Sequence, residues 1–153
     1  MIGSKILLVD DEEIFSRNMA KLLTTRGYQV TAVNGGDAAI RTLAEHPVDV
    51  IVLDLKMPGM DGLTTLKEIQ KLGLFTQTLI LTGHGSIDSA LEAMKLGAYD
   101  YLTKPCNVEE LVAKIQGAWH KKDSTVKHES REKAQKVAGA PTAFFEVFPS
   151  KKR

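Results

Sequence analysis

The sequence predicts an α/β fold: a doubly wound, five-stranded parallel sheet with the strand order 2-1-3-4-5 and helices on both faces. Three observations predict it. Short apolar runs alternate with longer stretches in which apolar residues recur every three or four positions, the pattern of repeated strand and helix. Several of the short runs are continuously apolar, as strands covered on both faces are. Glycine or proline stands where several of the helical stretches end.

Five strands are expected along the chain, each followed by a helix. The strands are Lys5–Val9, Gln29–Val33, Val48–Leu53, Thr78–Leu81 and Asp100–Thr103. Five stripes of apolar residues at helical spacing mark the five helices. In chain order, the stripes are Phe15/Met19/Leu22/Leu23, Ile40/Leu43/Ala44, Leu63/Leu66/Ile69, Ile87/Ala90/Leu91/Met94 and Val108/Leu111/Val112/Ile115/Trp119. Gly27 and Gly97 stand where C-cap glycines are expected, and Pro47 ends the second helix.

The length allows one domain with a tail. The 153 residues are 43% hydrophobic and 25% charged, which supports an ordinary core over residues 1–120 and argues against wholesale disorder. Five strand–helix units with short right-handed connections suit the flavodoxin-like order of strands. Residues 121–153 form a basic C-terminal tail, either a helix extension or a disordered segment. Within it, Phe144, Phe145 and Phe148 form either a docking peptide or a strip folded back on the body.

Charge and cysteine content exclude several classes of protein. The formal net charge of +1 is no signature of general polyanion binding, although residues 1–119 hold 15 acidic and 11 basic residues and residues 120–153 hold 4 and 9. The basic tail is most simply a solvated flank, with weak binding to nucleic acid or to an acidic partner left open. A single cysteine, Cys106, excludes an internal disulfide. No apolar run approaches the length of a membrane span, so we expect a cytoplasmic protein.

Reactive polar residues follow four of the five predicted strands. The first strand runs into Asp10 and Asp11, the third into Asp54, the fourth into Thr82 and the fifth into Lys104. In open parallel sheets, ligands bind beyond the carboxyl ends of the strands, at the point where the strand order reverses. Because the first and third strands are neighbours in the predicted order, three carboxylates should converge on one crevice.

These carboxylates predict a magnesium site that is suited to a phosphoryl group. Three carboxylates so close repel one another unless a cation neutralises them. Hard oxygen ligands without cysteine or histidine favour magnesium or manganese over zinc or copper. Magnesium also accepts phosphate oxygens, for which Lys104 supplies a cation and Thr82 a hydrogen-bond donor. Asp54, alone at the end of the central strand, is the candidate nucleophile for phosphorus.

Each of these residues also has a simpler explanation. Acidic residues such as Asp10 and Asp11 are typical of a helix N-terminus, and Asp54 alone is typical of a cap. Thr82 alone is an ordinary β-branched strand residue, and Lys104 alone a solvated charge. A chance placement of reactive polar residues at the ends of four strands is much less common than a single site that needs all of them.

Four motifs resemble the receiver domain of bacterial two-component response regulators, with the fold of the stand-alone chemotaxis regulators. They are Val9–Asp11, Leu53–Gly62, Leu81–Gly83 and Tyr101–Pro105, and the resemblance covers residues 5–119 in order and at the family's spacing. Residues 83–101 are most similar to receivers attached to transcriptional activators. No such effector is recognised in residues 120–153.

The resemblance implies a phosphoacceptor and a metal site. Asp54 would accept a phosphoryl group from a histidine kinase or a phosphotransfer protein. Asp11, Asp54 and the backbone carbonyl of Lys56 would hold magnesium, and Asp10 would help through water.

The resemblance also implies a switch. Thr82 and Lys104 would grip the phosphoryl oxygens, and Tyr101 would change rotamer as Thr82 moves. The Lys104–Pro105 peptide bond would be cis, although only about 5 to 6% of the peptide bonds before proline in folded proteins are cis.

Three further positions bear on the rate of the chemistry and on local packing. Lys56 and His84, two residues beyond the phosphoacceptor and the threonine, occupy variable positions that by resemblance tune the hydrolysis of the phosphoryl-aspartate. Cys106 stands where the family often has phenylalanine, which affects packing more than chemistry.

Two other classes of function fit the sequence less well. An aspartate-nucleophile phosphatase on a related fold typically has a second acid two residues after the nucleophile, where Lys56 stands here, and the short loops leave no material for a lid. A flavin- or nucleotide-binding module needs a glycine-rich loop after the first strand, where Asp10 and Asp11 stand instead.

We therefore expect a stand-alone receiver that is not an enzyme beyond self-catalysed phosphotransfer and autodephosphorylation. Phosphorylation would change a surface that by resemblance includes Lys95 and Tyr101. The signal would pass to a separate downstream protein, through a homodimer, or onward as a phosphorelay intermediate without its own output. Direct DNA binding is not expected, because residues 120–153 hold no helix-turn-helix pattern.

Overall fold

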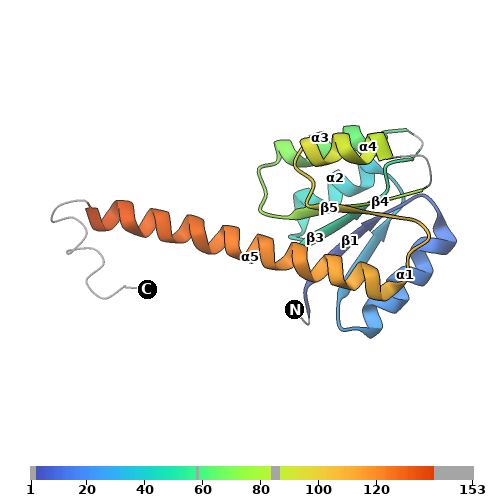
Figure 1. Cartoon of the computed structure of the whole chain (residues 1–153), viewed down its shortest axis with the longest axis horizontal. Helices are drawn as coiled ribbons and strands as arrows, with labels where there is room; N and C mark the ends of the chain where they lie inside the picture. Colours follow the sequence, from blue (N-terminus) through green and yellow to red (C-terminus); the bar gives the residue numbers. More distant parts are fainter. Residues whose placement is uncertain (1–2, 58, 84–86, 140–153) are drawn as a thin grey trace. The chain divides into compact units, whose positions relative to one another are not determined.

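Strands and helices alternate along the chain (Figure 1). The computed structural model describes residues 3–57, 59–83 and 87–139, and the side chains of those up to residue 127. The elements are β1 (Lys5–Val9), α1 (Glu13–Thr25), β2 (Gln29–Val33), α2 (Gly36–Glu45), β3 (Val50–Leu53), α3 (Gly62–Lys71), β4 (Gln77–Thr82), α4 (Ile87–Lys95), β5 (Asp100–Thr103) and α5 (Val108–Gly139). By its internal contacts the chain divides into two units, Met1–Lys122 and Asp123–Arg153.

The first unit is built on a five-stranded sheet of order β2-β1-β3-β4-β5, as predicted. All neighbouring strands are parallel, and Leu7 of β1 lies opposite Thr31 of β2 and Ile51 of β3. The apolar β1 and β3 therefore occupy the interior of the sheet, where both faces are covered. The less apolar β2 forms one edge, and its residues are exposed or half-buried.

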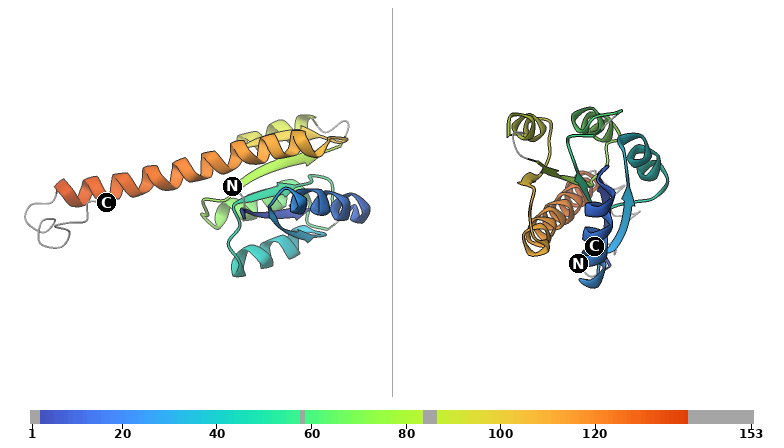
Figure 2. Two further views of the ribbon diagram at one scale, coloured as in Figure 1. Left: turned by 90° about the horizontal axis from the view of Figure 1, so that it is seen from below. Right: turned by 90° about the vertical axis from the view of Figure 1, so that its right-hand side faces the viewer.

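Alternate residues of each strand enter two separate apolar cores. One core joins Leu7, Ile51 and Ile80 to helices α2, α3 and α4. The other joins Leu8 and Val52 to α1 and to the beginning of α5. The two cores lie on opposite faces of the sheet because successive strand side chains point to opposite faces. Figures 1 and 2 show the resulting helix layers on the two sides of the sheet.

The ends of the helices follow the predicted punctuation. Gly27 and Gly97 adopt positive φ, 95° and 106°, just past α1 and α4. After α1, the amide of Gly27 donates to Thr24 and that of Tyr28 donates to Leu23, the pair of bonds that defines a Schellman cap. At the start of α3, Asp61 Oδ1 accepts from the amide of Thr64 at 2.8 Å and serves as the N-cap.

The bounds of β3 and β4 differ from the prediction, and β4 includes Gln77 and Thr82 at its two ends. Strand β3 begins at Val50 rather than at Val48, although Val48 is buried. The carbonyl of Val48 instead accepts a hydrogen bond from Thr76 Oγ1 at 2.6 Å, so it belongs to the connection before the strand. Helix α5 continues beyond the apolar stripe to Gly139, and residues 140–153, with the phenylalanine cluster, lie outside the described residues. Among the described helices, none is both long and apolar enough to cross a membrane.

Candidate functional site

The sheet delivers the predicted polar residues to one edge. Its backbone hydrogen bonds continue one residue beyond the strands, because the amide of Asp10 donates to Val33 at 3.1 Å and that of Asp54 donates to Val9 at 2.9 Å. At the other side of the sheet, the amide of Lys104 donates to the carbonyl of Thr82 at 2.7 Å. The backbones of these strand-end residues are therefore fixed by the sheet rather than by loops.

Lys104 joins these strand ends through its ammonium group. The Nζ atom lies 2.7 Å from Asp10 Oδ2 and 3.5 Å from Asp54 Oδ2, and it also pairs with Glu12. Only 14% of the Lys104 side chain is exposed, and the two aspartates are almost fully buried. The centre of the Phe15 ring lies 4.5 Å from Nζ, within range of a cation–π interaction. One cation thus compensates three carboxylates.

Asp54 is a buried carboxylate held by the chain that follows it. Its Oδ1 accepts a hydrogen bond from the amide of Lys56 at 3.1 Å. Burial raises the pKa of Asp54 to about 6, and the neighbouring charge of Asp10 adds to that rise, whereas the Lys56 amide and Lys104 oppose it. A carboxylate with little solvation and a raised pKa is a stronger nucleophile than an exposed one.

The pKa of Lys104 is raised above its ordinary value. Burial by itself lowers the pKa of this lysine, but hydrogen bonds to Asp10 and Glu12 and the charges of Asp10 and Asp54 more than offset it. Lys104 therefore stays protonated and retains its charge for any anion that enters the crevice.

Carboxylate oxygens of Asp10, Glu12 and Asp54 all lie within 4.8 Å of one another. This set of hard oxygen donors fits magnesium. The predicted ligand Asp11 is exposed and stands outside the group, and Glu12, for which no role was predicted, stands inside it. The reason is a local turn, in which the amide of Glu12 donates to Asp10 Oδ1 at 2.9 Å.

Thr82 provides a hydroxyl without a partner. The residue is completely buried at the end of β4, and its Oγ1 has no hydrogen-bond partner among the described residues. A buried, unsatisfied hydroxyl costs about 1–3 kcal/mol, and this one is available to donate to a ligand at the end of β4.

The other predicted site residues surround this centre or lie outside the described residues. Lys56 is exposed beside Asp54, and Tyr101 is half-buried against the core shared by α2, α3 and α4. The Lys104–Pro105 bond is cis. Cys106 is half-exposed, and burial raises the pKa of its thiol. His84 lies outside the described residues.

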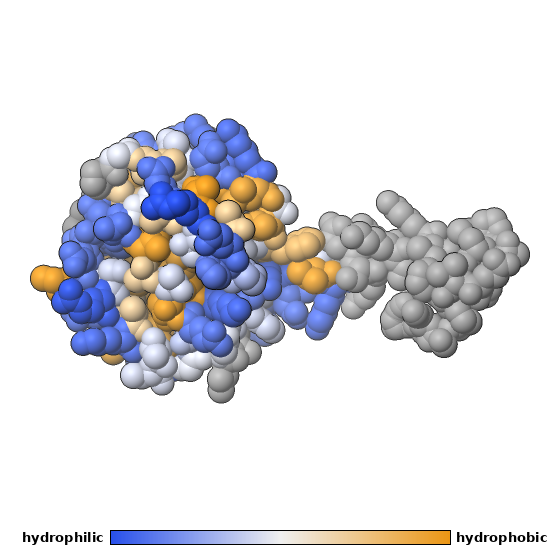
Figure 3. Space-filling view, turned by 180° about the vertical axis from the view of Figure 1, so that it is seen from behind, coloured by the Kyte–Doolittle hydropathy of each residue, from blue (hydrophilic) through white to orange (hydrophobic). Residues whose placement is uncertain are grey.

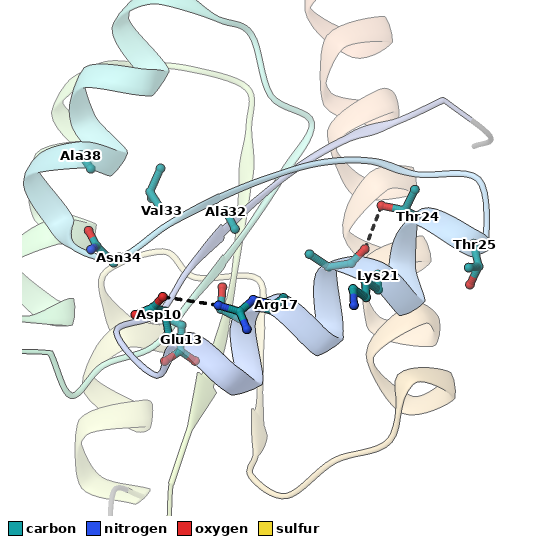
Figure 4. Close-up of a pocket in the computed structure, with 12 residues that line it drawn as sticks. Asp10, Glu13, Arg17, Lys21, Thr24, Thr25, Ala32, Val33, Asn34 and Ala38 are labelled. Atoms are coloured by element: carbon teal, nitrogen blue, oxygen red, sulfur yellow. Dashed lines mark hydrogen bonds and ion pairs between the residues drawn. The ribbon is translucent and has the colours of Figure 1, made fainter.

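A groove of about 1030 Å³ lies beside the crevice, along α1 and β2 (Figure 4). Asp10 lies at its border, whereas Asp54 and Lys104 do not line it. On its α1 wall, Arg17 pairs with Glu13 at 3.5 Å, and Thr24 Oγ1 donates to the carbonyl of Ala20 at 2.8 Å. The groove therefore adjoins the centre at Asp10 but does not include Asp54 or Lys104.

The surface offers no single dominant apolar area on the face turned away from the viewer of Figure 1. Figure 3 shows apolar side chains there in patches that hydrophilic ones interrupt. Exposed large apolar residues occur on several elements of the described chain and include Ile14, Leu22, Leu72, Leu74, Phe75, Ile87 and Leu91. Scattered exposure of this kind is usual for globular proteins.

Residues 6–116 match the family model of the response regulator receiver domain. The chain is similar to regulatory protein AtoC of Escherichia coli (strain K12), with 33% identity over 115 residues that cover 75% of this chain and 25% of AtoC. It is also similar to transcriptional regulatory protein ZraR of the same strain, with 39% identity over 113 residues that cover 74% of this chain and 26% of ZraR. The chain thus spans about a quarter of the length of these relatives.

Solved structures give the same match. A response regulator receiver domain protein from Clostridium thermocellum is 36% identical with a TM-score of 0.76, covering 80% of this chain and 98% of that one. The receiver domain of NtrX from Brucella abortus is 30% identical with a TM-score of 0.72, covering 75% of this chain and 98% of that one.

Proposed function

The chain belongs to the response regulator receiver domain family, and on that premise we propose that Asp54 accepts a phosphoryl group from a histidine kinase or a phosphotransfer protein. One observation carries the proposal. Asp54 is a buried carboxylate whose Oδ2 lies 3.5 Å from the Lys104 ammonium, at the same sheet edge as Thr82, whose hydroxyl has no partner among the described residues. A nucleophile, a cation and a free hydrogen-bond donor are the groups that phosphoryl transfer requires.

In the proposed reaction, a carboxylate oxygen of Asp54 attacks the phosphorus of a phosphohistidine. The new bond is O–P, the P–N bond breaks, and its electron pair stays on the imidazole nitrogen. Lys104 binds the negative oxygens of the transferred group, and Thr82 donates a hydrogen bond to one of them. The buried surroundings of Asp54 exclude bulk water from the attacking oxygen.

Magnesium is the metal that this site fits. Asp10, Asp54 and either Asp11 or Glu12 would supply its carboxylates, and the carbonyl of Lys56 would supply a further oxygen. When bound, the ion neutralises charge on the carboxylates and on the phosphoryl oxygens. Asp11 as a ligand stays a prediction, because its side chain is exposed outside the group that contains Asp10 and Asp54.

The consequence of phosphorylation is a changed surface. A phosphoryl group adds about −1.5 to −2 charge and new acceptors. We propose that Thr82 moves towards it and that Tyr101 follows, so that the face containing Lys95 and Tyr101 is presented differently to a downstream protein or to a second copy. Lys56 and His84 would set how long the phosphoryl group lasts. In this proposal, residues 1–120 are the receiver and residues 121–153 a basic flank.

The proposal is tested by intact-mass spectrometry after incubation with acetyl phosphate, with and without magnesium. We expect a gain of about 80 Da, one phosphoryl group, in the native chain with magnesium and none in Asp54→Ala. Asp61→Ser is the matched control, because it removes a neighbouring carboxylate while a serine N-cap replaces the aspartate cap of α3. Phosphorylation of Asp54→Ala to the native extent would refute the proposal. The absence of phosphorylation of the native chain with both acetyl phosphate and a histidine kinase would also refute it.

A further inference from the structure

Glu12 is an exposed side chain that nevertheless reaches the buried centre. Its side chain is 61% exposed, yet its carboxylate pairs with Lys104 and lies within 4.8 Å of carboxylate oxygens of Asp10 and Asp54. The next residue, Glu13, is 81% exposed and pairs only with Arg17, at 3.5 Å, among the ion pairs of the described residues. Two adjacent glutamates thus have different environments.

The backbone sets this difference. The amide of Glu12 donates to Asp10 Oδ1 at 2.9 Å, which turns the chain after β1, and the carbonyl of Glu12 accepts from the amide of Ser16 at 2.9 Å as α1 begins. Glu12 is therefore fixed at both its amide and its carbonyl. The backbone thus places the Glu12 side chain at the end of the sheet where Lys104 lies, and the ion pair with Lys104 holds its carboxylate there.

A phosphoryl group on Asp54 would share the Lys104 ammonium with the carboxylates that already pair with it. An ammonium group has three N–H donors. Glu12 accepts a hydrogen bond from Nζ, Asp10 Oδ2 lies 2.7 Å and Asp54 Oδ2 3.5 Å from it, and the Phe15 ring lies on another side. A phosphoryl group on Asp54 therefore competes with these carboxylates for the ammonium. Displacing buried Asp10 leaves an uncompensated buried charge, whereas the carboxylate of exposed Glu12 can be hydrated.

From this geometry we propose that Glu12 is a positioning residue that holds Lys104 in the unphosphorylated crevice and competes with the phosphoryl group for it. The proposal rests on the proposed function, because it concerns the lysine that receives the phosphoryl oxygens. Glu12 keeps the half-buried ammonium in place at rest. It also makes the phosphorylated form less favourable than it would be with a neutral residue at this position.

The expected size of the effect follows from the exposure of the pair. Ion pairs with an exposed partner contribute about 0.2–1 kcal/mol, which corresponds to about a 1.4- to fivefold change in an equilibrium constant. Lys104 itself is only 14% exposed, which places the effect towards the upper end. We therefore expect Glu12→Gln to bind a phosphoryl group about two- to fivefold more favourably than the native protein.

The experiment compares the native chain with Glu12→Gln and Glu13→Gln. Both variants remove one negative charge from adjacent positions, but only Glu12 contacts Lys104. Beryllofluoride serves as the phosphoryl mimic, and its affinity is measured by 19F NMR at a magnesium concentration shown to be saturating for each variant. We expect tighter binding by about two- to fivefold in Glu12→Gln and a change below about 1.4-fold in Glu13→Gln.

A second measurement omits metal and mimic. Competitive acetylation followed by peptide mass spectrometry reports how readily the Lys104 amine reacts. We expect faster acetylation of Lys104 in Glu12→Gln than in the native chain, and the native rate in Glu13→Gln. Equal rates in all three proteins would mean that Glu12 does not hold the lysine, and would overturn the inference.

The outcomes separate this inference from the proposed function. If the native chain binds beryllofluoride and is phosphorylated at Asp54, but Glu12→Gln binds no tighter than Glu13→Gln, only the role of Glu12 is wrong. Weaker binding in Glu12→Gln would mean that Glu12 serves the metal or the mimic, and would also overturn it. If the native chain neither binds the mimic nor is phosphorylated, the proposed function fails, and the acetylation rates still decide whether Glu12 holds Lys104.

Discussion

Replacing Gly62 by alanine should strain the backbone that carries Asp54. Gly62 is the first residue of α3, and its amide donates to the carbonyl of Leu55 at 3.0 Å. A Cβ atom on Gly62 would lie 2.3 Å from Leu55 Cα and 2.6 Å from the carbonyl oxygen of Asp54, whereas ordinary contacts are 3.4–4 Å. Helix α3 and the segment after β3 must therefore move apart by about 1 Å. Both clashing groups are backbone, so no side-chain rotation relieves them.

Two opposing effects set the magnitude for Gly62→Ala. Overpacking of this kind costs about 1–3 kcal/mol, and contacts with backbone lie at the upper end. Alanine recovers up to about 1 kcal/mol through helix propensity and the unfolded state. We expect a net loss of about 2 kcal/mol in the free energy of unfolding, and slower phosphorylation of Asp54 because its carbonyl must shift.

The assay is urea unfolding followed by circular dichroism, with Gly35→Ser as the control. Gly35 precedes α2, has an extended φ of −174°, and has no atom within 4 Å of the position of a Cβ. Serine there adds a side chain in open space and is a good N-cap, so its stability should change by less than about 0.5 kcal/mol. A loss below about 0.5 kcal/mol for Gly62→Ala, or one equal to that of Gly35→Ser, would refute the reasoning.

Three further predictions concern titratable groups. Because burial raises the pKa of Asp54 to about 6, folding stability without metal should fall as the pH rises from about 4 to about 6. Asp54→Asn should therefore be more stable than the native chain by about 1–2 kcal/mol at pH 7 but not at pH 4. Urea unfolding in EDTA measures both proteins. The pKa of Asp49 is shifted the other way. Burial by itself raises this pKa, but Lys122, at 2.7 Å, and the amide of Lys5 lower it overall. The contribution of Asp49 to the free energy of unfolding, about 0.5–1 kcal/mol, should therefore be present at pH 7 and fade as the pH falls below about 4. Unfolding of Asp49→Asn at both pH values checks this, and a difference from the native chain that is independent of pH would contradict it. Since burial raises the pKa of the Cys106 thiol, its reaction with a disulfide reagent at pH 7 should be slower than that of an unfolded control; an equal rate would count against the burial.

The sequence predicts the sheet order and most element bounds because the relevant signals are local or periodic. Continuous apolar runs identify the buried strands. Glycine at positions 27 and 97 marks two helix ends, where the structure shows the positive φ that glycine adopts readily. The position of the polar residues at strand ends was also predictable, because parallel strands bring their carboxyl ends to one edge. The sequence alone therefore assigns Asp10, Asp54, Thr82 and Lys104 to a common edge.

The contacts of individual side chains were not predictable in the same way. Within the acidic run after β1, residue type alone does not distinguish Asp11 from Glu12, and the turn through Asp10 decides which carboxylate faces Lys104. The Phe15 ring was assigned to the apolar stripe of α1, and its 4.5 Å approach to the Lys104 ammonium depends on two segments far apart in the chain. Such pairings follow from tertiary packing, which no local pattern encodes.

The contact between Lys104 and Asp10 has a consequence for the order of events during synthesis. Asp10 follows the first strand, and Lys104 follows the last strand of the sheet. A ribosome therefore completes all the acidic residues of the crevice well before the lysine that compensates them, and Lys104 follows the strand that pairs last along the chain, β5 with β4. Under the proposed function, an unfinished or misfolded copy is a poor substrate for a kinase. Competence for phosphorylation then depends on the last strand of the sheet, because that strand supplies Lys104.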